Sequence, residues 1–141
     1  MILSTSQEAQ KAVDVDWQIT YSCNFDCVYC FPGAHRHAVQ AKEDGKESLI
    51  DAAMRIFPVG SVLHLTGGEP TLYPHFTQLC FELTQEFTNG MNTNLSNDVM
   101  KEFADTIDPT RVTVIHCAVH IEERMRREKS LDSFTRRFNY L

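Results

Sequence analysis

The strongest constraint on the fold is a strand-like stretch followed by a helix-like stretch, repeated four times along the 141 residues. Apolar residues recur at every second position in the first kind of stretch and at helical spacing in the second. The expected strands are residues 15–21, 59–66, 90–95 and 111–120, and the expected helices are residues 47–57, 75–87, one capped by Ser96 and one capped by Ser130. Strands that alternate with helices form a parallel sheet with right-handed crossovers. The chain is therefore expected to be an α/β protein whose strand ends share one edge of a sheet.

Three cysteines, Cys23, Cys27 and Cys30, stand just beyond the first expected strand. Thiolates at this density select zinc or an iron-sulfur centre over magnesium or calcium. Most cubane clusters take four cysteines, so three would leave one iron open to a small molecule. A structural zinc ion usually has four protein ligands, and the fourth would have to come from elsewhere in the chain. The cysteines alone leave both kinds of centre open.

A Gly-Gly-Glu-Pro turn, Gly67 to Pro70, follows the second expected strand. Glycines let the backbone approach a ligand closely. A carboxylate such as that of Glu69 can accept charge-assisted hydrogen bonds from an amine or ammonium group. This turn therefore offers a ligand both close backbone contact and a hydrogen-bond acceptor.

The cysteine spacing C-x3-C-x2-C and the turn together resemble the radical S-adenosylmethionine (SAM) enzymes. The resemblance implies a partial βα barrel, of which this chain would hold about four units, and a [4Fe-4S] cluster bound by Cys23, Cys27 and Cys30. It also implies that the open iron chelates SAM. Reductive cleavage of SAM to methionine and a 5′-deoxyadenosyl radical would then serve hydrogen abstraction from a substrate that the resemblance does not define.

The resemblance further implies a set of SAM-binding residues. Tyr29 matches an aromatic residue that lies near the adenine in the family. His120 ends a stretch in which many members have a serine that helps to hold the ribose, but Ala118 replaces that serine here, so the ribose contact is unassigned. The candidate SAM-binding residues are Tyr29, Gly67, Gly68, Glu69, Pro70, Asn94, Ser96 and His120.

Other reactive side chains are expected to have structural roles. Cys80 and Cys117 lie in apolar patterns and are expected to behave as small hydrophobic residues. His64 and His116 are expected to be ordinary core or surface histidines. Residues 122–129 interleave acidic and basic side chains, a pattern typical of an exposed, salt-bridged segment.

The length predicts an incomplete barrel. Residues 1–14 are expected to form a polar lead-in, and residues 15–141 the N-terminal part of a radical SAM core domain. A full eight-unit barrel takes ~250 residues, or about 31 for each unit. The domain is therefore expected to be incomplete at its C-terminal end, either because it is truncated or because the protein is a naturally shortened relative.

Composition limits the partners. A hydrophobic content of 43% and a charged content of 23% are ordinary for a globular protein. The net charge of -6 argues against non-specific nucleic-acid binding. The sequence lacks a secretory signal and a membrane-spanning run of ~20 apolar residues, so we expect a cytoplasmic protein without a membrane partner. The resemblance implies a reductant such as flavodoxin or ferredoxin.

Two other functions fit the same residues. The chain could be a catalytically inactive iron-sulfur module for binding or electron transfer, because a short barrel would shelter a radical poorly. It could also be a zinc-stabilised structural domain, in which case the Gly-Gly-Glu-Pro turn would be a coincidence.

Overall fold

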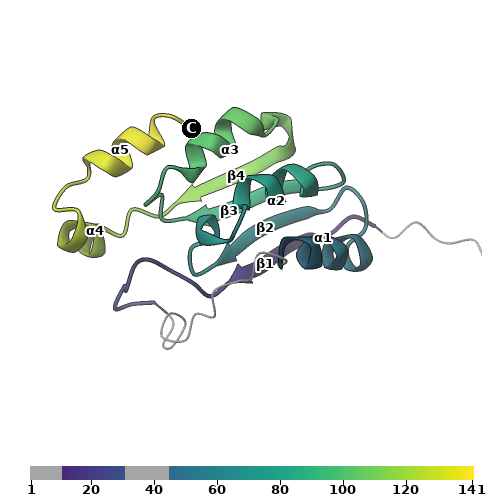
Figure 1. Cartoon of the computed structure of the whole chain (residues 1–141), viewed down its shortest axis with the longest axis horizontal. Helices are drawn as coiled ribbons and strands as arrows, with labels where there is room; N and C mark the ends of the chain where they lie inside the picture. The colour runs from purple at the N-terminus through teal and green to yellow at the C-terminus, as the bar shows by residue number, and fades with distance from the viewer. Residues whose placement is uncertain (1–10, 31–44) are drawn as a thin grey trace, which may run out of the picture.

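The computed structural model describes residues 11–30 and 45–141, and this part of the chain folds around one parallel sheet (Figure 1). Its strands lie in the order β1-β2-β3-β4, and each pairs with the next in parallel. The elements are β1 (Asp14–Thr20), α1 (Gly45–Ile56), β2 (Val62–Gly67), η1 (Pro70–Leu72), α2 (Phe76–Leu83), β3 (Thr88–Thr93), α3 (Val99–Thr106), η2 (Pro109–Arg111), β4 (Val112–Cys117), α4 (Ile121–Arg127) and α5 (Asp132–Phe138). The expected α/β fold, a partial βα barrel with four parallel strands, is confirmed.

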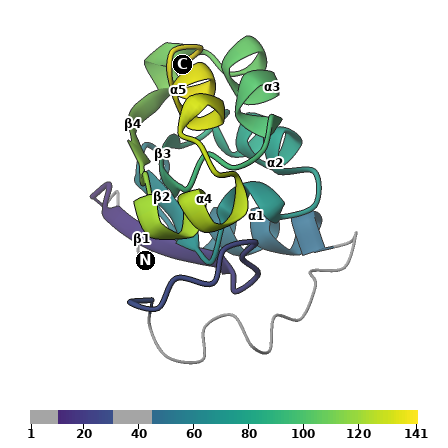
Figure 2. The same ribbon diagram turned by 90° about the vertical axis from the view of Figure 1, so that its left-hand side faces the viewer.

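The core lies on one face of the sheet, which α1, α2 and α3 cover (Figure 2). Leu63 and Leu65 of β2 are fully buried, while His64 between them is only partly buried. In β3, Met91 is fully buried and Asn92 is exposed. Each fully buried Leu or Met side chain stabilises the fold by about 1.5–3 kcal/mol relative to an exposed one. The opposite face of the sheet, which we call the open face, carries the exposed or partly exposed polar residues of the strands, such as His64 and Asn92.

The boundaries of three strands differ from expectation by two residues or more, and β2 begins at Val62, three residues later than expected. β3 begins at Thr88, two residues early, because Asn89 is buried with its side-chain amide donating to the carbonyl of Cys80 at 3.3 Å. β4 ends at Cys117, three residues before the expected end, and the chain then enters α4 through His120, whose φ is 48°. The shifts of β3 and β4 depend on interactions that apolar periodicity does not encode.

The prediction that Ser96 caps the third helix is wrong. α3 begins at Val99, and the side-chain oxygen of Asn97 accepts a hydrogen bond from the Val99 backbone at 3.1 Å. The hydroxyl of Ser96 instead accepts a hydrogen bond from the side chain of Asn24 at 2.7 Å. At the last helix, α5, the N-cap position is Leu131, one residue after the expected Ser130, although the Ser130 hydroxyl accepts a hydrogen bond from the Asp132 backbone at the start of the helix.

The prediction that residues 122–129 are an exposed, salt-bridged segment is confirmed for most of them but is wrong for Glu123 and Arg124. Most of them form α4, in which Arg124 is fully buried and Glu123 is 5% exposed. Arg124 pairs with Glu128, and Glu123 pairs with Arg127, so both ion pairs have the i,i+4 spacing that stabilises a helix. Alternating charges indicate a solvated segment, but the side chains of Glu123 and Arg124 are buried.

The ends of the described segments bear on other expectations. β1 begins at Asp14, so the last residue of the expected lead-in belongs to the sheet. Residues 1–10 and 31–44 lie outside the described residues. They include most of the expected lead-in and the segment that connects the cysteines to the first expected helix. No described helix is both long enough and apolar enough to cross a membrane.

Gly67 ends β2 where this strand approaches β1 most closely. Its φ is 138°, and a Cβ atom built on it would lie 2.0 Å from the carbonyl oxygen of Thr20. The position therefore requires glycine both for its backbone angle and for the space beside it.

We expect Gly67→Ala to lower the free energy of unfolding by more than about 2 kcal/mol, because it adds a backbone clash to a strained φ that alone costs on the order of 1–3 kcal/mol. Urea unfolding of the purified chain measures the loss. Gly60→Ala is the matched control, since Gly60 also has a positive φ of 82° but has nothing within 4 Å of a built Cβ. Equal losses in the two variants would contradict the clash.

Candidate functional site

A pocket of about 230 Å³ opens at the carboxyl edge of the sheet, and residues from all four strand ends line it. Parallel strands bring their carboxyl ends to one edge, where α/β proteins place their ligands. The lining comprises Cys23, Phe25, Cys27, Cys30, Thr66, Gly67, Gly68, Asn92, Thr93, Asn94, Ala118 and His120. The three clustered cysteines and the two glycines of the turn therefore share one cavity.

The Gly-Gly-Glu segment joins the start of the cysteine loop, by which we mean residues 21–30. The backbone N–H of Gly68 donates to Thr20 at 2.9 Å, and that of Glu69 donates to Ser22 at 2.7 Å. A Cβ on Gly68 would lie 2.2 Å from the Ser22 carbonyl oxygen. The absence of this atom lets the two segments run side by side into the pocket.

Each of the three cysteines is partly buried, and two backbone or amide donors approach the first. The N–H of Phe25 donates to Cys23 Sγ at 3.4 Å, and the side-chain amide of Asn94 lies 3.9 Å from the same sulfur. Burial raises the pKa of the Cys23 thiol, although the Phe25 N–H opposes this shift. Burial also raises the pKa of the Cys27 thiol. Metal binding at these thiols therefore has to displace protons.

This arrangement fits a cluster better than a single ion. Among the described residues, no group of three or more His, Cys, Asp or Glu side chains could hold one metal ion. Zinc needs its ligand sulfurs at about 2.3 Å from one centre. A cubane instead takes one cysteine at each iron, so its three thiolates stand apart around a cavity. Three cysteine sulfurs that line one pocket match the ligand arrangement of a cubane.

Glu69 lies beneath the pocket with 1% of its surface exposed. Its carboxylate accepts four hydrogen bonds: from the backbone and hydroxyl of Thr71 at 3.1 and 2.6 Å, from the hydroxyl of Thr93 at 2.8 Å and from the backbone of Asn94 at 2.6 Å. A carboxylate has about four lone-pair sites. The Glu69 side chain therefore binds η1 and the end of β3. The part of the Gly-Gly-Glu-Pro turn that lines the cavity is Gly67 and Gly68.

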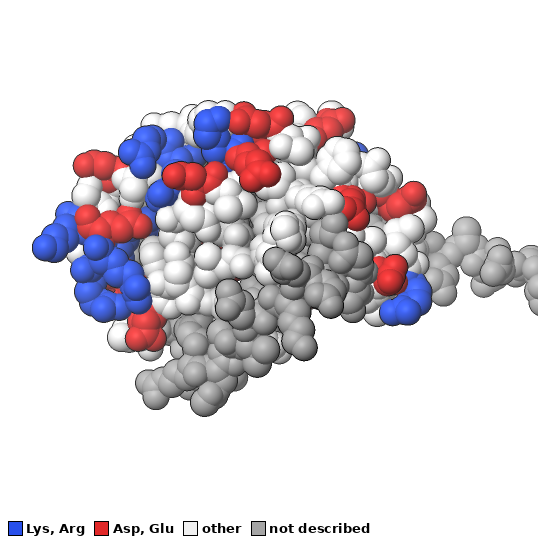
Figure 3. All heavy atoms as spheres, viewed as in Figure 1, with Lys and Arg blue, Asp and Glu red and all other residues white. Residues whose placement is uncertain are grey.

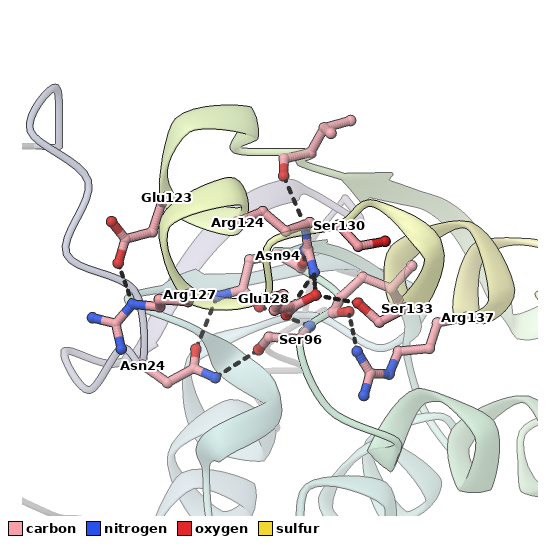
Figure 4. A network of polar contacts seen from close by, with 12 residues as sticks. Asn24, Asn94, Ser96, Glu123, Arg124, Arg127, Glu128, Ser130, Ser133 and Arg137 are labelled. Atoms are coloured by element: carbon pink, nitrogen blue, oxygen red, sulfur yellow. Dashed lines mark hydrogen bonds and ion pairs between the residues drawn. The ribbon is translucent and has the colours of Figure 1, made fainter.

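Asn94 connects the end of β3 to the cysteine loop. Its side-chain amide donates to the side-chain oxygen of Asn24 at 3.0 Å, and its own side-chain oxygen accepts from the Ser96 backbone at 3.0 Å. Asn24 in turn donates to the Ser96 hydroxyl. These three residues form a closed ring of hydrogen bonds (Figure 4). Asn94 and Ser96 thus hold the loop that carries Cys23.

Aromatic contacts surround His120 at the mouth of the pocket. Tyr29 stacks on its ring at 5.9 Å with an interplanar angle of 11°, and Phe25 meets it edge-on at 5.9 Å. His120 Nδ1 lies 2.6 Å from the Tyr29 hydroxyl and 3.5 Å from Cys27 Sγ. Burial, together with the charge of Arg124, lowers the pKa of His120, so its imidazole is neutral at pH 7.

Helix α4 contacts the cysteine loop at two residues. The carboxylate of Glu123 accepts the backbone N–H of Asp26 at 3.0 Å, and the guanidinium of Arg124 lies 5.1 Å from the centre of the Phe25 ring. Sequence reasoning missed both residues. The signal that could have found them is the i,i+4 charge spacing of this segment, which favours a helix.

Comparison with known proteins defines the family. The radical SAM superfamily pattern matches residues 17–139, which is most of the chain. This chain belongs to the radical SAM superfamily. Enzymes of this superfamily use a [4Fe-4S] cluster and SAM, so the cofactors implied by the sequence are those of the family.

Curated relatives include radical SAM proteins named for a cyclase reaction. A GTP 3',8-cyclase of Actinobacillus pleuropneumoniae is 35% identical over 75 residues, covering 52% of this chain and 22% of the cyclase. A probable GTP 3',8-cyclase of Saccharolobus solfataricus is 26% identical over 127 residues, covering 87% of this chain and 40% of the relative. A UPF0026 protein of Helicobacter pylori is 32% identical over 77 residues, covering 50% of this chain and 25% of the relative.

This radical SAM chain thus spans well under half the length of these relatives, with 22% to 40% of each matched. No solved structure matched the chain.

The structure brings together at this pocket most of the site residues expected from the sequence. The pocket is lined by Cys23, Cys27, Cys30, Gly67, Gly68, Asn94 and His120. Tyr29, Glu69, Pro70 and Ser96 do not line it: Tyr29 stacks on His120, Glu69 is buried beneath, Pro70 begins η1 and Ser96 binds Asn24. Their contacts with SAM stay predictions.

We expect Glu69→Gln to destabilise the cluster-free protein by roughly 3 kcal/mol. The substitution removes a charge that receives four hydrogen bonds and sets an amide donor against other donors. Urea unfolding measures the effect. Glu82→Gln on α2, whose side chain is partly exposed, is the control. An unchanged midpoint for the Glu69 variant would show that this carboxylate does not hold the strand ends.

Acid should weaken the attachment of the cysteine loop to α4. Burial opposes the ionisation of Glu123, but bonds from Arg127 and Arg126 outweigh it and lower the pKa to about 2. The pKa of a glutamate in an unfolded chain is roughly 4.3. The ionised form therefore stabilises the fold above that value, and the stabilisation is lost as pH falls toward 2.

Thermal unfolding between pH 7 and pH 2 tests this expectation with Glu123→Gln. The variant should be less stable at pH 7 and should lose less stability than the natural chain on acidification. Glu122→Gln, at the exposed neighbouring position, should follow the natural chain. Parallel pH curves for the natural chain and the Glu123 variant would contradict the assignment.

Proposed function

We propose that Cys23, Cys27 and Cys30 bind a [4Fe-4S] cluster in the pocket at the carboxyl edge of the sheet, and that SAM binds beside it against Gly67 and Gly68. The observation that carries this proposal is that the three thiols and the glycine backbone line the same cavity. The chemistry that the bound cofactors supply is one-electron cleavage of SAM to methionine and a 5′-deoxyadenosyl radical, which abstracts hydrogen from a substrate.

The protein's own residues supply geometry for this reaction. The Phe25 N–H, directed at Cys23 Sγ, favours the thiolate form of that ligand. The carboxylate of Glu69 holds the turn after β2 against the end of β3. Together these bonds preorganise the cavity, so that little rearrangement is required when the cofactors bind.

The stacked pair of Tyr29 and His120 is the proposed contact for the nucleoside part of SAM. A neutral imidazole can donate from one ring nitrogen and accept at the other. Tyr29 is 61% exposed, so one face of its ring is open to stacking with adenine. Because Ala118 has no hydroxyl, the ribose contact falls to His120, which lines the pocket two residues further along.

The substrate is proposed to reach the radical from the open face of the sheet. Thr66 and Asn92 belong both to this face and to the pocket lining. Farther from the pocket the same face carries Gln18 and His64, so a substrate rich in hydrogen-bonding groups matches it better than an apolar one.

The proposed electron donor is a flavodoxin or ferredoxin. Lys and Arg side chains, interspersed with Asp and Glu, lie over α4 and α5 (Figure 3), and α4 contacts the cysteine loop through Glu123. These basic groups match a negatively charged protein that delivers an electron near the cysteines.

Cys27→Ala should abolish cluster binding and SAM cleavage together. Anaerobic reconstitution with iron and sulfide gives the iron content, and electron paramagnetic resonance of the dithionite-reduced protein, with and without SAM, reports the cluster. Cys117→Ala is the matched control, because Cys117 belongs to β4 and does not line the pocket. The control should keep its iron and its SAM-dependent spectrum.

The outcome separates the three functions. A reduced-cubane signal that SAM perturbs supports the proposal, and normal SAM cleavage by the Cys27 variant would sink it. A cluster that ignores SAM would instead favour the inactive iron-sulfur module. A colourless protein with stoichiometric zinc would favour the structural domain.

A further inference from the structure

We propose that Glu123 and Arg124 of α4 are positioning residues that hold the cysteine loop in its cluster-binding conformation before a cluster is present. The inference rests on the proposed function, since it concerns the same three cysteines. Neither residue lines the pocket. Arg124 acts through Phe25 and Asn94, which line the pocket. Glu123 acts through Asp26, which precedes Cys27 in the chain.

Glu123 fixes the backbone between the first two cysteines. Its side chain accepts the N–H of Asp26, which immediately precedes Cys27. The same carboxylate receives Arg126 at 2.6 Å and pairs with Arg127. The two arginines neutralise its charge, so the bond to Asp26 is made by a carboxylate that stays ionised at neutral pH.

Arg124 fixes the loop through an aromatic contact. Its guanidinium is fully buried and lies between two rings, 5.1 Å from the centre of Phe25 and 4.9 Å from that of Phe134 on α5. Phe25 is 4% exposed and lines the pocket between Cys23 and Cys27. Cation–π contacts are strongest in a desolvated site, so this contact favours one position of the ring.

Arg124 also acts on Cys23 through Asn94. The guanidinium donates to the backbone carbonyl of Asn94, to the carbonyl of Val119 at 3.0 Å and to the carboxylate of Glu128 at 3.0 Å. The side-chain amide of Asn94 approaches Cys23 Sγ and donates to Asn24. A single buried cation therefore links α4, the end of β3 and the first cysteine.

The cost of this arrangement argues for a specific role. Burying an ion pair is often no more stabilising than burying apolar side chains of the same size. Here the pair is Arg124 and Glu128. The guanidinium of Arg124 also donates to the end of β3 and contacts the Phe25 ring of the cysteine loop. Outer residues of this kind change metal affinity by about 10–100-fold when they are removed.

Arg124→Met and Glu123→Gln test the proposal in the full chain. We expect each variant to bind the reconstituted cluster at least tenfold more weakly, measured as iron retained against a chelator. Arg124→Met should also give a more negative midpoint potential, because a positive charge near the cluster is lost. Arg124→Lys keeps the positive charge but lacks the planar guanidinium with its several donors. Compared with Arg124→Met, it should restore the midpoint potential more fully than it restores the iron affinity.

Arg137→Met is the matched control. Arg137 lies on α5 with its side chain 17% exposed, and its hydrogen bonds go to Asp98 and to the carbonyl of Leu95. This variant should lose stability without losing iron affinity. If the Arg124 and Glu123 variants also lose only stability, with natural iron affinity and midpoint potential, the positioning role is wrong.

Hydrogen exchange of the cluster-free protein separates this inference from the proposed function. In the natural chain the Asp26 amide should be protected, and Glu123→Gln should speed its exchange at least tenfold more than the exchange of the Gly68 amide. Failure of the natural chain to bind a cluster would overturn the proposed function alone. Unprotected Asp26 in the natural cluster-free chain would overturn the positioning role.

Discussion

The carboxylate of Glu69 is the buried charge around which the functional edge of the sheet is built. Among the described residues none of its hydrogen-bond donors is a cation, and four donors from Thr71, Thr93 and Asn94 satisfy it. A buried charge is tolerated only when its bonding capacity is filled. The carboxylate therefore fixes three segments at once, and the Gly-Gly backbone that faces the pocket is held as a consequence.

The main chain of Asn94 lies between two buried charges of opposite sign. Its N–H donates to Glu69, and its carbonyl accepts from Arg124. The peptide groups on either side of this residue are thereby fixed in direction, and the side chain is left to bind the cysteine loop. Hydrogen bonds in such a low-dielectric site are stronger than in water, and leaving either charge unpaired would be costly. The cavity thus owes its shape to polar contacts beneath it as much as to the apolar core.

The sequence predicted the parts of this architecture that follow from periodicity and local chemistry. Alternating strands and helices require a parallel sheet, and a parallel sheet requires the loops of Cys23 and Gly67 to meet at one edge. It did not predict α4, because the charges of Glu123 and Arg124 give no indication that they point inward. Nor did it predict the work of Ser96 and Asn94, since a hydroxyl or an amide after a strand can equally cap a helix, bind a ligand or hold a distant loop. These choices depend on partners 70 or 72 residues away in the chain.

The backbone conformation of His120 lowers the stability of the fold at a position next to the pocket. Its φ of 48° lies in the left-handed region, which costs a side-chain-bearing residue roughly 1–2 kcal/mol and costs glycine almost nothing. A chain optimised for stability alone would have glycine or asparagine at this junction. The imidazole that stands there instead contacts Cys27 and Tyr29. The junction between β4 and α4 is thus a point of trade-off, where a stabilising substitution is readily available and would remove a group from the pocket.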